Sequence, residues 1–143
     1  MVAPPPAATA APPPRTVGVA QETAGGNARV QQPAAHSRRP LGEIPETYGF
    51  HRTMGPTYHH IENGLYHFTF IKALTNLTDL GPDDGGTTVI AGTHKIPDDV
   101  PKDAIIAAAY ADTSMIHHVK APAAPTLPFS ASLINAAGLT RHG

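Results

Sequence analysis

The chain has 143 residues, a net charge of −1 at pH 7 and no cysteine. This length allows one domain, and the near-neutral charge gives no reason to expect nucleic acid or an anionic membrane as a partner. The absence of cysteine excludes disulfides and thiolate metal sites. No window reaches the apolar length of a membrane span, and no apolar N-terminal segment is typical of a secretory signal, so we expect a cytoplasmic protein.

Residues 1–40 differ in composition from the rest of the chain. They hold eight of the sixteen prolines and ten alanines, and they contain no Phe, Tyr, Trp, Leu or Ile. Such a segment cannot bury enough apolar surface to offset the entropy lost on ordering it. We therefore predict a disordered Ala/Pro-rich tail over residues 1–40 and a folded domain over residues 41–143.

The first part of the domain has the pattern of β-strands. Residues 58–61 are β-prone, and Asn63-Gly64 is a strong hairpin signal. Residues 65–80 are rich in aromatic and β-branched residues on both faces, which predicts a strand buried within a sandwich or barrel. A glycine-rich acidic turn over residues 81–86 leads to a returning strand over residues 87–91.

The second part contains one predicted helix, residues 101–112, because Pro101 suits a first helical turn and a run of alanines favours helix. Residues 115–121 and 126–134 are further candidate strands. Pro128 argues against a central position for the strand over residues 126–134, since proline has no N–H to donate to the ladder of a central strand. Residues 135–143 are predicted to be loop, and the whole pattern predicts a mostly β fold with one short helix.

Two segments resemble a known family. Residues 77–95 read LTDLGPDDGGTTVIAGTHK, and residues 121–136 read APAAPTLPFSASLINA. Both resemble motifs of the phytanoyl-CoA dioxygenase family of iron(II)- and 2-oxoglutarate-dependent oxygenases, in which the first forms a central hairpin. The resemblance implies a partial double-stranded β-helix, or jelly roll, incomplete at its C-terminus, and hydroxylation of a small molecule that the sequence does not identify.

The family binds iron through the two ligands of a His-x-Asp/Glu motif and a later His. These three ligands leave three coordination positions of the iron open. His60 and Glu62 form the only His-x-acid triplet, and strand alternation places both on one face. The spacing between His51 and the motif that begins at Leu77 resembles the family's spacing and favours His51 as the first ligand instead. Thr53 then stands at the position of the acid. Both alternatives stay open for the first ligand.

The resemblance places Asn135 where the family has its distal histidine, and Asn offers no imidazole nitrogen. Arg141 is a candidate partner for the carboxylate of 2-oxoglutarate, although the family's own cosubstrate arginine would lie beyond residue 143. Two functional hypotheses follow. The chain is either an iron(II)/2-oxoglutarate hydroxylase of a small molecule, or an inactive or truncated jelly-roll relative that acts at most as a binding module. Neither hypothesis specifies an oligomeric state.

Overall fold

The computed structural model describes residues 14–23, 26, 47–55, 57–81, 84–123, 126–130 and 132–138. In these residues short strands predominate, as the composition and alternation predicted. The elements are α1 (Pro14–Thr23), β1 (His59–Glu62), β2 (Leu65–Phe68), β3 (Ile71–Thr75), β4 (Thr87–Ile90), η1 (Thr93–Lys95), α2 (Lys102–Ala111), η2 (Thr113–Met115), β5 (Ile116–His118), β6 (Thr126–Ser130) and β7 (Asn135–Ala137).

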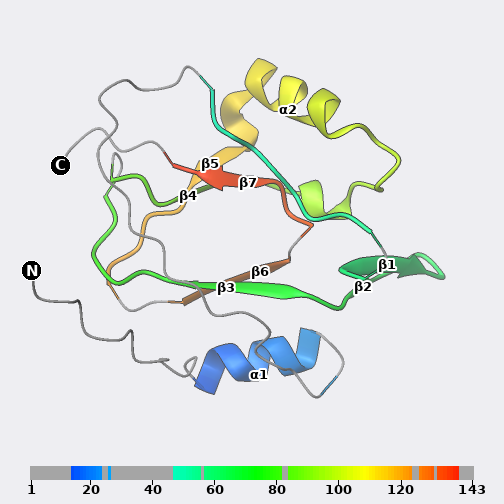
Figure 1. The fold of residues 1–143 in the computed structure, drawn as a ribbon, viewed down its shortest axis with the longest axis horizontal. Coiled ribbons are helices and arrows are strands. Elements are labelled where there is room, and N and C mark those ends of the chain that lie inside the picture. Colours follow the sequence, from blue (N-terminus) through cyan, green and yellow to red (C-terminus); the bar gives the residue numbers. More distant parts are fainter. Residues whose placement is uncertain are drawn as a thin grey trace, which may run out of the picture.

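The strands form three small antiparallel sheets. β1 pairs with β2, β3 pairs with β6, and β4 lies between β5 and β7. Figure 1 shows the strands between α2 on one side and α1 on the other, with the β1–β2 hairpin at one end. No closed barrel is formed by the described strands, so the observed class is a mostly β fold with two short α-helices.

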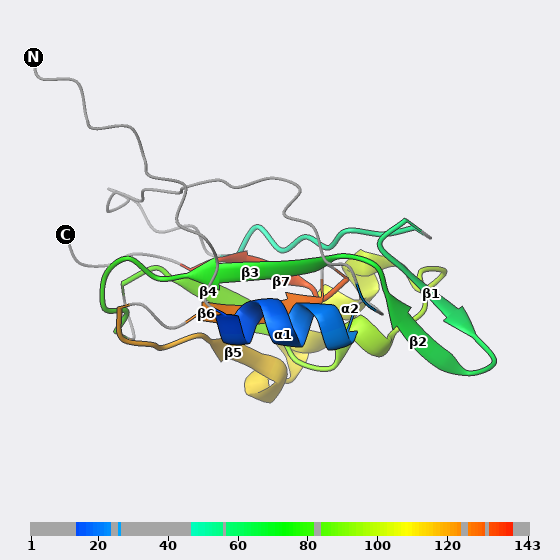
Figure 2. The same ribbon diagram turned by 90° about the horizontal axis from the view of Figure 1, so that it is seen from below.

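The β1–β2 hairpin confirms the Asn63-Gly64 prediction. Both turn residues have positive φ, 52° for Asn63 and 75° for Gly64, as a two-residue type I′ turn requires. Gly64 has no Cβ and adopts this conformation without strain. Figure 2 shows that the hairpin projects from the body of the molecule.

The prediction of one long strand over residues 65–80, buried on both faces, is wrong. The chain leaves the strand at Thr69, whose N–H donates to Tyr58 O at 3.1 Å and whose hydroxyl donates to Thr57 O at 2.7 Å. β2 therefore ends before β3 begins. On β2, alternate side chains are exposed, and Leu65 keeps 65% of its surface, because no other strand among the described residues pairs with or extends this two-stranded sheet.

The segment 77–95 connects two sheets instead of forming a hairpin. β3 pairs with β6 in the register Ala73↔Pro128, whereas β4 pairs with β5 and β7. The expectation of a central hairpin here is therefore corrected. Both strands of a two-stranded sheet are edges, which is where proline is tolerated, so Pro128 fits β6.

The core lies between α2 and the β5–β4–β7 sheet. Its buried apolar residues are Phe50, Ile90, Ile105, Ala109, Ile134 and Ala136. The helix predicted over residues 101–112 is confirmed as α2, which follows Pro101 and ends before Asp112. The helix contributes Ile105 and Ala109 to the core, four residues apart on one face.

Two predictions fail at the ends of the chain. Residues 14–23, within the tail that was predicted to be disordered, form the helix α1. The expectation of one α-helix is therefore corrected to two. α1 begins at Pro14 and packs against β6; proline is tolerated in a first turn. The predicted loop over residues 135–143 contains β7, because Asn135–Ala137 pairs with β4. The rest of the predicted tail lies outside the described residues, apart from Gly26.

Candidate functional site

His51 and Asn135, which the resemblance assigned to the iron site, lie directly opposite each other. The His51 N–H donates to Asn135 O at 2.9 Å, and the Asn135 N–H donates to His51 O at 2.9 Å. β7 thus has β4 on one side and the His51 segment on the other. Two residues separated by more than eighty positions meet at one place on the sheet.

The side chains at this bridge are turned to the main chain. Asn135 is buried, and its amide Nδ2 donates to Leu133 O at 2.8 Å and reaches His51 O at 3.5 Å. The His51 ring is exposed, with Nδ1 at 3.2 Å from Gly49 O. Thr53 supplies a hydroxyl where the family has a carboxylate. A single imidazole, a hydroxyl and an engaged amide do not fit an iron site that needs two imidazoles and a carboxylate.

Arg52 and His59 meet around Asp98, beneath the hairpin. The Arg52 side chain is fully buried, and its guanidinium donates to Ile96 O at 3.3 Å and Val100 O at 3.2 Å. Asp98 Oδ1 lies 3.3 Å from Nε2 of the buried His59 and 3.9 Å from Arg52 Nη2. The His59–Asp98 contact is at ion-pair distance but is not aligned as a hydrogen bond.

The second Asp98 oxygen, Oδ2, accepts the Gly55 N–H at 2.9 Å. Asp98 therefore connects three features: the buried Arg52, the start of β1 at His59, and the loop that precedes it. Buried polar groups of this kind are costly when a partner is removed. These contacts join the first residue of the hairpin, and the loop before it, to Asp98 in the body of the molecule.

The opposite, outer face of the hairpin carries His60, Glu62 and His67. His60 pairs with His67 across the strands, and their rings stack with centroids 4.8 Å apart at an interplanar angle of 10°. All three side chains are exposed, and one potential ligand atom from each lies within 4.8 Å of the others. The alternation of β1 had placed His60 and Glu62 on one face, and the structure brings them together.

Sequence reasoning missed His67 as a member of this group. The signal was present, since a two-residue turn at Asn63-Gly64 fixes the pairing of the strands, and counting outward from it sets His67 opposite His60. Arg141 lies outside the described residues. The sequence-predicted residues therefore separate into two places: the bridge with His51 and Asn135, and the hairpin with His60 and Glu62.

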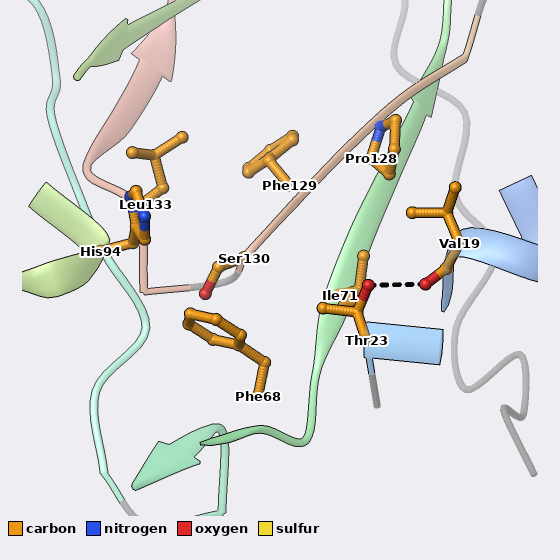
Figure 3. Close-up of a pocket in the computed structure, with 9 residues that line it drawn as sticks. All are labelled: Val19, Thr23, Phe68, Ile71, His94, Pro128, Phe129, Ser130 and Leu133. Atoms are coloured by element: carbon orange, nitrogen blue, oxygen red, sulfur yellow. Dashed lines mark hydrogen bonds between the residues drawn. The ribbon is translucent and has the colours of Figure 1, made fainter. Parts of the chain in front are cut away.

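A cavity of about 260 Å³ lies between η1, the end of β2, β6 and α1. Figure 3 shows His94 and Leu133 at one end and Val19 and Thr23 of α1 at the other, with Ser130 between them. The complete lining is Val19, Thr23, Phe68, Ile71, His94, Pro128, Phe129, Ser130 and Leu133.

The cavity wall is mainly apolar, and His94 and Ser130 are its principal polar groups near Phe68. Burial lowers the pKa of His94 below its usual value of 6.5, and the neighbouring Lys95 charge lowers it further. The His94 ring centroid lies 6.2 Å from that of Phe68. A neutral imidazole at His94 offers the cavity one hydrogen-bond donor and one acceptor, whereas the Ser130 hydroxyl bonds Ser132.

Comparison of the chain with protein-family models, curated proteins and solved structures gives no match. Within the described residues, no helix has the length and apolar character needed to cross a membrane.

Proposed function

We propose that this chain is a jelly-roll relative of the iron(II)/2-oxoglutarate oxygenases that binds a small molecule without hydroxylating it. The resemblance of residues 77–95 and 121–136 to the phytanoyl-CoA dioxygenase family supports the relationship. The pairing of β3 with β6 and of β4 with β7 supports it further. Long-range antiparallel pairs distributed over two sheets are typical of jelly rolls.

The observation that carries the loss of hydroxylation is the environment of Asn135. Its amide is committed to the Leu133 and His51 carbonyls, in the place where the resemblance requires an imidazole nitrogen. The hydroxyl of Thr53 is a poor replacement for an anionic ligand to a divalent cation. Of the two hypotheses that the sequence left open, the binding module agrees better with these contacts.

The cavity beside His94 supports small-molecule binding. At about 260 Å³ it lies slightly below the usual range of ligand sites, about 300–1,000 Å³. Its occupant would be a compact apolar molecule with one polar group. The apolar part would contact Phe68 and Phe129, and the polar group would bond to the His94 imidazole, because the Ser130 hydroxyl already bonds Ser132.

Iron binding at the bridge is tested with anaerobic protein, iron(II) and 2-oxoglutarate. The His67→Ala variant is used as the background, so that the hairpin histidines do not contribute. We expect no visible charge-transfer band in this background and a band after adding Thr53→Asp and Asn135→His, which supply the missing ligands. A band in the background variant that is lost on His51→Ala, and that is followed by succinate formation once oxygen is admitted, would establish an active iron(II)/2-oxoglutarate oxygenase instead.

Ligand binding is tested separately with p-cresol, which combines a compact apolar ring with one hydroxyl. We expect saturable chemical-shift changes at Phe68, Phe129 and Ser130 in amide NMR spectra. Leu133→Trp, which fills the cavity, should abolish these changes, whereas Leu77→Ala at an exposed loop position should preserve them. Shifts confined to residues outside the cavity would contradict the assignment.

A further inference from the structure

We propose that the outer face of the β1–β2 hairpin is a binding site for a divalent first-row transition metal, held by His60, Glu62 and His67. This site is independent of the proposed function, because it uses neither the His51–Asn135 bridge nor the cavity beside His94. It also differs from the ligand sets expected from the sequence, since His67 replaces the distal residue at position 135.

The register of the hairpin brings the three side chains to one place. His60 is directly opposite His67, and Glu62, two residues further along β1, lies on the same face. Directly opposite side chains have Cβ atoms about 5 Å apart, which two imidazoles can bridge through one ion. The donor atoms already lie within 4.8 Å of one another.

The hairpin backbone is held from its other face. The His59 side chain lies against Asp98, and the Tyr66 hydroxyl donates to the main-chain carbonyl of Lys95. The Asn63-Gly64 turn fixes the two strands in register. Only side-chain rotation is then needed to bring the three donor atoms to one ion. Because the backbone is already ordered, metal binding loses little backbone conformational entropy.

The donor set selects the kind of metal. Two imidazole nitrogens favour zinc, copper, iron and nickel, whereas magnesium and calcium prefer all-oxygen sites. Three protein ligands leave at least one coordination position for water or an external group. All three ligands are exposed, and C–H oxidation needs an enclosed, water-excluding site. The structure therefore assigns metal binding, and not C–H oxidation, to this face. The cavity beside His94 is a separate site, because Phe68, which lines it, points to the opposite face of β2 from His67.

The site is tested on the tag-free full chain by titrating cobalt(II) and following its visible absorption, with zinc(II) as competitor. We expect one cobalt ion per chain, displaced by zinc and unaffected by excess magnesium. His67→Ala should weaken cobalt binding by about tenfold or more, and Glu62→Gln by less, because the amide keeps one oxygen donor. His117→Ala, an exposed histidine on β5, is the matched control and should leave the affinity unchanged.

A second measurement does not depend on the variants. Zinc should shift the ring resonances of His60 and His67 in the unmodified protein and leave those of His117 and His118 in place. Equal cobalt affinity in His67→Ala, or zinc-induced shifts confined to other histidines, would overturn the proposal. Reduced amide dispersion of the hairpin in metal-free His67→Ala would identify a folding defect, and the zinc shifts of the unmodified protein would then decide.

Discussion

The bridge between His51 and Asn135 and the outer face of the hairpin differ in what surrounds their polar side chains. At the bridge, Asn135 is buried and its amide is used by main-chain carbonyls. On the hairpin, His60, Glu62 and His67 are exposed and have donor atoms close together. Asn135 of the bridge belongs to the β5–β4–β7 sheet of the core, whereas the hairpin projects from the body of the molecule.

This difference explains why a family resemblance alone does not locate a metal site. A position in a motif specifies where a ligand would stand, but the ligand atom must also be free of other partners. Asn135 stands at the right position, opposite His51, but its side-chain amide is already bonded to the Leu133 carbonyl. His67 belongs to neither motif segment, yet its ring faces His60 across the hairpin.

The largest effect is expected in the core beside the bridge. Ile134 is fully buried next to Asn135, so Ile134→Ala should lower the free energy of unfolding by about 2–5 kcal/mol. Leu65→Ala, on the exposed face of the hairpin, should change it by less than about 0.5 kcal/mol. Urea unfolding followed by circular dichroism measures both, and similar losses would refute the division into core and projecting hairpin.

A second prediction concerns the contact between the glycine-rich turn and the end of β7. A Cβ at Gly138 would overlap the Gly85 carbonyl oxygen, which is main chain and cannot rotate away. Gly138→Ala should therefore destabilise the protein by about 1–3 kcal/mol. Gly49→Ala is the control, because a Cβ there meets no atom within 4 Å. Unchanged stability of Gly138→Ala would mean that the turn is not packed against this strand.

The third prediction tests whether Asp98 holds the hairpin to the body. Asp98→Ala removes the acceptor of the Gly55 N–H and the anion beside Arg52 and His59. We expect a loss of about 1–3 kcal/mol and faster amide exchange across β1 and β2. Asp99→Ala, at an exposed neighbouring position, is the control. Exchange that stays slow in the hairpin of Asp98→Ala would show that other contacts suffice.

The smallest effect concerns pH and the cavity. Burial, with a contribution from Lys95, lowers the folded-state pKa of His94 below 6.5. The unfolded chain therefore binds more protons at this residue, and stability falls as the pH decreases below about 6.5. His94→Gln should reduce this loss slightly, because the ring is only partly buried. Parallel stability–pH curves for the two proteins between pH 7 and pH 5 would contradict the lowered pKa.

Features governed by neighbours in the chain were predictable. The hairpin followed from Asn63-Gly64, because few residue pairs accept positive φ at both positions. α2 followed from Pro101 and its alanines. The shared face of His60 and Glu62 followed from strand alternation. In each case the determining interaction spans a few residues.

The sequence by itself determined the mostly β character, the hairpin turn and α2. Tertiary structure alone decided that β3 pairs with β6, that β7 joins β4, and that the Asn135 amide is already bonded. Strand pairing over long separations depends on which apolar faces can be buried together, and local pattern does not encode that choice. The side chain at position 135 was visible from the start, but its hydrogen-bond partners existed only once the chain was folded.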